Sequence, residues 1–249
     1  MFFRKASSAP LRYVACVSYP RSGHHLTVRI VKHYFRDEFK YCSFYETGSE
    51  GCCRSFPCQD SSVTMTKNHD MEVLQPDGGL EKLPSIPYLV LVRNFLDAVV
   101  SDYQLFLREH TDSREAWEGF SQRKATYYRA FVQKWAIASD NLEKVIVRYE
   151  DLTDNSLNTF SRIVKLFAPQ RQVKSWHLKR LIENAALEDV KPDATKVIKH
   201  FGVHNRRRIE DFHHFCPEYF GRLEEMVSAE LFALGYTPRF DGFSANRAA

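Results

Sequence analysis

The sequence predicts an α/β fold of three layers, with a central, mostly parallel sheet flanked by helices. Three short apolar runs, at 12–18, 88–92 and 144–149, alternate with longer stretches whose apolar residues recur every three to four positions. Such alternation of strands and helices is typical of a parallel sheet covered on both faces. With 249 residues, 44% of them hydrophobic, the chain is large enough for one substantial core, so we expect a single domain over 1–249.

The first predicted unit is a strand, a glycine loop and a helix. The strand RYVACVS at 12–18 is apolar and β-branched without a helical period, and it stops at Pro20 and Gly23. From Leu26 to Phe35 the apolar residues recur at four-residue spacing, which predicts a helix with one apolar face. The chain therefore passes from a buried strand through a tight loop into a helix.

The middle of the chain contains the most hydrophobic run. Little periodicity is visible at 41–62, and a short strand is expected at 63–67. Proline and glycine residues at 76–87 indicate a long surface connection. The run YLVLV at 88–92 is too short for a buried helix, so it predicts a central parallel strand. Two helices should follow, at 96–107 and 114–138.

The last part of the chain predicts one further strand and several helices. KVIVRY at 144–149 has an apolar centre and ends before two acidic residues. The polar, irregular stretch at 186–216 predicts a loop or lid. A final helix should begin at Pro217 and stop at Gly235. Between the strand and the irregular stretch, helices are expected at 157–167 and 173–185.

Charge and hydropathy limit the classes of partner. Lys and Arg exceed Asp and Glu by a net +4, a modest excess that gives no reason to expect a nucleic-acid partner and would suit a phosphate-rich ligand. No apolar run is long enough to span a bilayer, and the polar RKASSAP near the start interrupts any signal peptide or anchor. We therefore expect a soluble, cytoplasmic protein, although a chain trimmed of its anchor would look the same.

Four of the six cysteines fall in one short segment. The four are Cys42, Cys52, Cys53 and Cys58. Their spacing contains no paired CxxC, which weakens a zinc interpretation without removing it. Disulfides in an oxidising compartment and free thiols in a reducing one remain the alternatives.

The loop YPRSGHH at 19–25 is a candidate anion site. Backbone N–H groups at a helix N-terminus, together with the helix dipole and Arg21, form a cradle for phosphate or sulfate. The motif GxxxxGK[ST] of the common ATP loop is absent. The alternative is a turn whose Gly23 only permits the bend.

A second anion site is expected where the central strand ends. YLVLV runs directly into Arg93, and Ser101 follows in the next predicted helix. Ligands of open parallel sheets bind beyond the carboxyl ends of the strands, so an arginine there faces the crevice. The alternative is a solvated Arg93 that pairs with Asp97.

Taken together, YPRSGHH and LVRNFLDAVVSDY resemble the sulfotransferases that use 3′-phosphoadenosine 5′-phosphosulfate (PAPS). The resemblance implies a P-loop-like fold and a reaction that requires no metal. It implies that Arg93 and Ser101 hold the 3′-phosphate of PAPS, and that Tyr149 in VRYEDL lies near the adenine. It also implies that the 5′-phosphosulfate is held by the loop residues Arg21, Ser22, Gly23, His24 and His25.

A third motif, Lys67-Asn68-His69-Asp70, lies at the end of a predicted strand and is similar to the Lys-x-His segment of this family. The resemblance implies that His69 takes the proton from the acceptor and that Lys67 faces the sulfuryl group. A hydroxyl is a poor nucleophile until a base with a pKa near 6.5 removes its proton. Cations such as Arg21 must also balance the charge that builds on the bridging oxygen.

The chain departs from the family pattern in three respects. Arg21 replaces the commoner lysine, and the histidine pair 24–25 replaces a threonine pair, so hydroxyl contacts to phosphate would become imidazole contacts. The C-terminal Arg-Lys-Gly element is missing. The basic stretch His204-Asn205-Arg206-Arg207-Arg208 lies in the corresponding region, and we expect Arg206 or Arg207 to reach the ligand.

The predicted function is in-line transfer of the sulfuryl group of PAPS to a hydroxyl or amine. The acceptor could be a glycan, a lipid or a small-molecule alcohol, because specificity lies in loops that no motif describes. We expect the irregular segments 41–58 and 188–216 to flank the acceptor opening. The alternatives are a nucleotide or small-molecule kinase with a P-loop-like fold, and a protein that binds PAP (adenosine 3′,5′-bisphosphate) or polyanions without catalysis.

Overall fold

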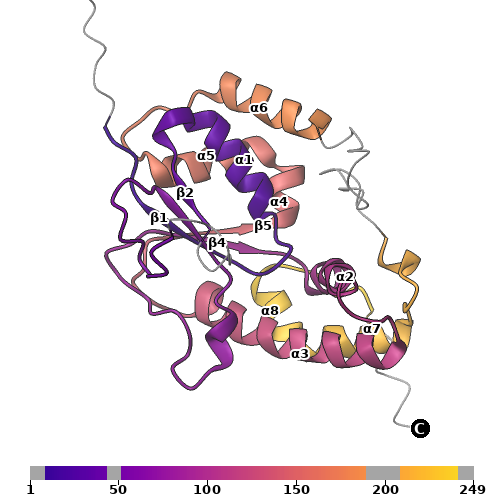
Figure 1. Cartoon of the computed structure of the whole chain (residues 1–249). Helices are drawn as coiled ribbons and strands as arrows, with labels where there is room; N and C mark the ends of the chain where they lie inside the picture. Colours follow the sequence, from indigo (N-terminus) through magenta and orange to yellow (C-terminus); the bar gives the residue numbers. More distant parts are fainter. Residues whose placement is uncertain (1–8, 44–51, 189–207, 241–249) are drawn as a thin grey trace, which may run out of the picture.

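A computed structural model describes residues 9–43, 52–188 and 208–240 (Figure 1). In these ranges five strands form one sheet in the order β2-β3-β1-β4-β5, and every neighbouring pair is parallel. The strands are β1 (Val14–Ser18), β2 (Tyr41–Cys42), β3 (Met65–Asn68), β4 (Tyr88–Val92) and β5 (Lys144–Arg148). The chain thus crosses between strands in the manner of an open, doubly wound sheet.

Helices cover both faces of this sheet, as Figure 1 shows. One face packs against α1, α5 and α6, and the other packs against α2, α3, α7 and α8. The bounds are α1 (His24–Phe35), α2 (Phe95–Phe106), α3 (Arg114–Val132), α4 (Tyr149–Asp154), α5 (Ser156–Phe167), α6 (Ser175–Glu188), α7 (Pro217–Met226) and α8 (Ser228–Ala233). The predicted three-layer α/β fold with a parallel sheet is confirmed.

The two cores follow from the two-residue alternation of side chains along a strand. Val14 and Cys16 of β1 belong to the core under α1, whereas Ala15 and Val17 belong to the core under α3. All five residues of β1 and all five of β4 are buried. Such strands, apolar on both faces, are typical of the centre of a parallel sheet.

Several boundaries differ from the sequence prediction. The two-residue strand β2 was not predicted, because so short a strand leaves no periodicity. Strand β5 ends at Arg148, so Tyr149 is the first residue of α4 and not the last of a strand. The predicted helix over 114–138 is α3 followed by a π-helical turn at Gln133–Ile137.

The final predicted helix is two helices, because the chain breaks at Val227. Its backbone leaves the helical region (φ −121°, ψ 15°), while its side chain is fully buried. Leu223, Val227 and Leu231 are all buried at four-residue spacing, so the apolar pattern runs unbroken across the kink. Periodicity alone therefore could not locate it.

The parallel arrangement brings the carboxyl ends of β1, β3, β4 and β5 to one edge of the sheet. The predicted site residues from Arg21 to Tyr149 lie on β3, in the loops after these strands, or on the helices α1, α2 and α4 that follow them. None of the helices in the described ranges has the length and apolar character needed to cross a membrane.

Candidate functional site

The loop between β1 and α1 depends on Gly23. Its φ of 87° lies in the left-handed region, which side chains disfavour. A Cβ at this position would lie 2.7 Å from Cδ1 of Leu152 and 2.9 Å from Cδ2 of Tyr149. Only glycine therefore lets the loop pack this closely against α4.

The first turn of α1 closes over this loop. Its first backbone hydrogen bond runs from Thr27 N–H to the carbonyl oxygen of Gly23, 3.0 Å away, so the amides of the first turn have no intrahelical acceptor. Ser22 is buried, and its Oγ has no hydrogen-bond partner. A buried hydroxyl without a partner at a helix N-terminus fits an anionic ligand that would accept its hydrogen bond.

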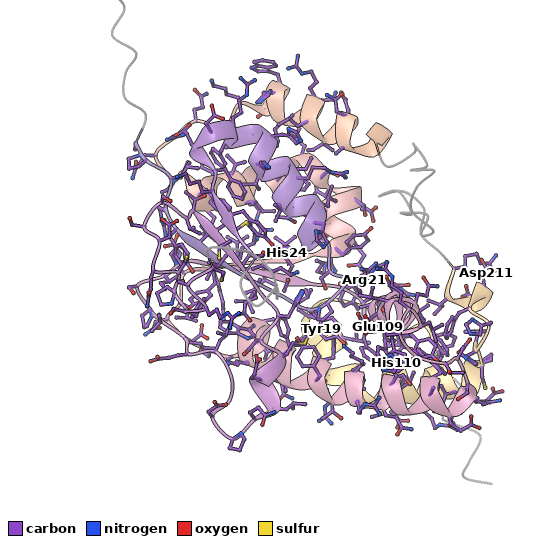
Figure 2. The ribbon with its side chains drawn as sticks, in the orientation of Figure 1. Tyr19, Arg21, His24, Glu109, His110 and Asp211 are labelled. Atoms are coloured by element: carbon purple, nitrogen blue, oxygen red, sulfur yellow. The ribbon has the colours of Figure 1, made fainter. Side chains whose placement is uncertain are left out.

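Arg21 connects this loop to α2. Its Nε donates a hydrogen bond to Oγ of Ser101 over 2.9 Å, and Figure 2 shows Arg21 beside α2. Its φ of 66° is in the left-handed region, where a non-glycine residue is strained. Burial lowers the pKa of the guanidinium, and the charge of Arg93 lowers it further. Two arginines thus converge, which an anion would stabilise.

Arg93 follows β4 and lies on the other side of the loop. Its Nη1 donates to the carbonyl oxygen of Arg21 over 3.2 Å, and its guanidinium lies 4.2 Å from the ring centroid of Tyr149. Its Nε is buried without a partner. The alternative pairing with Asp97 does not occur, because Asp97 forms a bidentate ion pair with Arg239.

His69 follows β3, next to the loop. Its Nδ1 lies 2.6 Å from the carbonyl oxygen of Ser18, and its ring centroid is 6.4 Å from that of His24. Because a carbonyl can only accept, Nδ1 carries the proton and Nε2 keeps its lone pair. Burial lowers the pKa of His69 to about 4, and the charge of Lys67 contributes to the shift.

His24 is turned into the protein. It is 5% exposed, its Nε2 lies 2.8 Å from the hydroxyl of Tyr41, and its Nδ1 lies 3.3 Å from Oγ of Ser18. Burial lowers its pKa well below the usual value, and the nearby charges of His69 and Lys67 lower it further. Both ring nitrogens have protein partners, so a ligand could reach the imidazole only by breaking one of these contacts.

The sequence did not reveal the residues that hold His69 in place. The hydroxyl of Tyr127, on α3, donates to the carbonyl oxygen of His69. The buried Asp70 carboxylate accepts from Nζ of Lys134 over 2.8 Å and from Nε1 of Trp135 over 2.7 Å. Asp70 is adjacent to His69, but its partners lie more than sixty positions away, so no local pattern could have found them.

A further ion pair lies near Arg21. Asp102 of α2 accepts from Nζ of Lys124 of α3 over 2.7 Å, and both side chains are largely buried. The charge of Asp102 favours the charged forms of both Arg21 and His69. In the sequence, Asp102 could have been noticed because it follows the predicted site residue Ser101. Nothing in the sequence near Lys124 pointed to the site.

Part of the predicted site cannot be placed. Arg206, Arg207, His204 and Asn205 lie outside the described residues, as do 44–51 and 189–207 of the two segments expected to flank the acceptor opening. Arg208 is described; it is exposed and lies 3.5 Å from Glu210.

A separate cluster of Asp112, His213 and His214 has metal-ligating atoms within 4.8 Å of one another. The carboxylate lies 2.6 Å from Nε2 of His213 and 2.7 Å from Nε2 of His214, and it accepts from the hydroxyl of Tyr103. Both carboxylate oxygens of Asp112 therefore already have hydrogen-bond partners within the protein.

The arrangement as a whole supplies two kinds of chemistry. Arg21 and Arg93, from different strand ends, can bind an anion with more than one charged group. The imidazole of His69, with Nε2 as acceptor, can take a proton from a nucleophile beside that anion. No ATP-type loop lysine lies at the start of α1.

Comparison with a solved structure shows the same fold. The mouse sulfotransferase SULT7A1 in complex with PAP matches with a TM-score of 0.60 at 14% identity, over 88% of this chain and 84% of that chain. The sulfotransferase STF9 from Mycobacterium avium matches with a TM-score of 0.46 at 11% identity, over 70% of this chain and 42% of that chain. Among curated proteins, none matches the sequence.

Comparison with protein families agrees with the motifs. The family model described as the sulfotransferase domain matches residues 12–214, which include the loop at 19–25, the Lys-x-His segment and Arg93. Because this match covers well over half of the chain, the protein belongs to the sulfotransferase domain family.

Proposed function

We propose that this protein transfers the sulfuryl group of PAPS to a hydroxyl or amine of an acceptor, with His69 as the general base. The observation that carries the proposal is the convergence of Arg21, Ser101 and Arg93 around the β1–α1 loop. We further propose that the whole chain acts as one domain in the cytoplasm, and that the acceptor is a glycan, a lipid or a small-molecule alcohol.

The donor fits the polar atoms that the protein leaves without partners. Ser22 Oγ and Arg93 Nε are buried and lack a hydrogen-bond partner. We assign the loop and Arg21 to the 5′-phosphosulfate, and Arg93 with Ser101 to the 3′-phosphate. Tyr149, whose ring already lies under Arg93, would border the adenine. We assign His24 to the anion through its backbone N–H rather than its ring, because the ring is engaged with Tyr41 and Ser18.

The proton transfer follows from the tautomer of His69. Its Nδ1–H donates to the carbonyl of Ser18, so Nε2 accepts the proton of the acceptor hydroxyl as that oxygen attacks sulfur. PAPS supplies the sulfuryl group, whose bond to the bridging oxygen breaks as PAP leaves. Lys67 and Arg21 balance the negative charge that develops on the leaving oxygen. No covalent intermediate with the protein and no metal are needed.

Ligand protection distinguishes the donor class. We expect PAP to raise the midpoint of thermal unfolding without magnesium, whereas a kinase would respond to ATP with magnesium. Mass spectrometry of a mixed acceptor panel with PAPS should then show the gain of one sulfuryl group. If PAP protects the protein but no acceptor class gives a sulfated product, the result would support the alternative of a protein that binds PAP without catalysis.

Arg93→Ala tests the assigned anion sites. Loss of a charge-assisted hydrogen bond should weaken PAP by about 10- to 150-fold, while adenosine 5′-phosphosulfate, which lacks the 3′-phosphate, should change much less. Calorimetry measures both affinities. Arg114→Ala removes the same charge from an exposed pair with Glu118 and should leave both affinities unchanged. Equal losses for the two ligands would remove Arg93 from the 3′-phosphate site.

A further inference from the structure

A cluster of three polar side chains, none of them assigned to PAPS, lies where α2 leads into α3. Asp112 follows α2, while His213 and His214 lie between a short 3-10 helical turn at Ile209–Asp211 and α7. One carboxylate oxygen of Asp112 lies 2.6 Å from Nε2 of His213, and the other lies 2.7 Å from Nε2 of His214. Two imidazole nitrogens and one carboxylate therefore meet at one point, although 101 and 102 positions separate them in the sequence.

A tight turn brings the two histidines to the same side. The N–H of Phe215 donates to the carbonyl oxygen of Phe212 over 2.8 Å, which closes a β-turn. His213 and His214 are its two central residues, whereas in an extended strand their side chains would point to opposite faces. The buried ring of Phe212 packs edge-on against that of Trp117 of α3, with the ring centroids 4.8 Å apart. The turn is thus fixed against α3, at whose start the carboxylate lies.

The carboxylate is also held from the side of α2. The hydroxyl of Tyr103 donates to Oδ1 of Asp112 over 2.9 Å, and the tyrosine is fully buried. A donor behind a ligating carboxylate is the usual outer shell of a metal site, because it fixes the orientation of the ligand. The side chains of His213 and Asp112 are 52% and 38% exposed, which leaves a path from solvent for an ion and a water molecule.

The ligand types and the distances both fit zinc. Two histidines, one carboxylate and a water molecule are an established ligand set for this ion, whereas magnesium and calcium prefer oxygen ligands. Tetrahedral bonds of about 2.0–2.1 Å set the ligand atoms about 3.3 Å apart. All three ligand atoms already lie within 4.8 Å of one another. Zinc would take the place of the two protons that now join the imidazoles to the carboxylate, and these groups would separate by roughly 0.7 Å.

We propose that Asp112, His213 and His214 bind one zinc ion, which fastens the turn before α7 to the corner between α2 and α3. The neutral imidazoles bind through Nε2 and keep their protons on Nδ1, so Zn²⁺ and one carboxylate give the site a net charge of +1. The inference does not depend on the proposed sulfuryl transfer, which needs no metal.

The first test measures zinc binding to the full chain, purified without a metal-binding tag and freed of metal by a chelator that is then removed. We expect calorimetry with zinc chloride to show saturable binding. The midpoint of thermal unfolding should rise with the zinc concentration and should not respond to magnesium chloride at the same concentrations. This measurement needs no substitution, so it stands even if a variant fails to fold. A chain that binds no zinc would overturn the proposal.

The second test identifies the ligands. Asp112→Asn and His213→Gln should each remove one bound zinc ion per chain, whereas His110→Gln, a matched change at an exposed histidine outside the cluster, should remove none. If Asp112→Asn fails to fold, the more exposed His213 decides. Tyr103→Phe keeps the buried ring and removes only its hydrogen bond, so it should weaken zinc binding by about 10- to 100-fold. The same zinc stoichiometry in the His213→Gln variant and in the unaltered chain would place the ion elsewhere and refute the site.

Discussion

At the scale of single residues, the chemistry of His69 depends on its surroundings. An unperturbed histidine has a pKa of 6.5, and burial lowers that of His69 to about 4. The imidazole is therefore neutral, and able to accept a proton, throughout the physiological range. The negative charge of a bound donor would raise this pKa again, toward the range that suits a base.

We expect His69→Ala to lower turnover by about 10²- to 10⁴-fold, which is the usual contribution of a positioned base. PAP affinity should change little, because the hydrogen bonds that hold Arg21, Ser101 and Arg93 together do not involve the imidazole. His33→Ala, at an exposed position of α1, is the control. Near-normal turnover of a hydroxyl acceptor would exclude His69 as the base.

The pH profile gives a second measurement on the same residue. A histidine base with an unperturbed pKa would make activity rise through pH 6.5, but the lowered pKa of His69 changes this expectation. Since kcat/KM reports the free enzyme, it should stay flat from pH 7.5 to about 5.5, where an unperturbed histidine would lose about tenfold. A tenfold fall over this interval would show that the imidazole is not shielded as described.

At the scale of elements, the β1–α1 loop is held by its contact with α4. We expect Gly23→Ala to destabilise the fold by about 2–5 kcal/mol, because about 1–2 kcal/mol of left-handed backbone strain adds to about 1–3 kcal/mol from the clash of its Cβ with Leu152 and Tyr149. PAP protection should fall as well, since a shift of the loop moves Arg21. Urea unfolding and calorimetry measure the two effects.

Gly78→Ala is the matched control for this loop. Gly78 has a φ of 72°, close to the 87° of Gly23, but nothing lies within 4 Å of its added Cβ. Gly78→Ala should therefore lower the free energy of unfolding only by the backbone strain, about 1–2 kcal/mol. PAP binding should be unchanged. If the two variants behave alike, close packing against α4 is not what shapes the loop.

At the scale of the whole molecule, the buried His24 and the partly buried His69 make stability depend on pH. The folded pKa values of His24 and His69 both lie below 6.5. Unfolded chains therefore bind protons first as the pH falls, and the stability present above pH 6.5 is lost progressively below it. Ordinary Asp and Glu side chains, with pKa values near 4, titrate mainly at and below the lower end of this range.

We expect the free energy of unfolding to fall between pH 6.5 and 4, with about 3 kcal/mol of the loss due to His69. Urea titrations at several pH values measure this slope. His69→Gln should flatten it, and His33→Gln should not. An identical slope in the unaltered protein and in His69→Gln would mean that His69 titrates alike in the folded and unfolded chains.

The sequence by itself determined four of the five described strands, most helices and the family, because these depend on neighbouring residues. YLVLV is apolar enough to be recognised as a central strand, and the loop at 19–25 carries its glycine and arginine in seven residues. Four of the six cysteines were visible as one group, although the pairing of Cys42 with Cys52 and of Cys53 with Cys58 was not.

Only the tertiary structure decided how distant residues act together. Arg21 meets Ser101 eighty positions later, Asp70 meets Lys134 across 64 positions, and Tyr127 supports His69 across 58. The pKa of His69 also follows from burial, which no local pattern contains. The physical reason is that parallel strands need long crossovers, so their carboxyl ends gather side chains far apart in sequence.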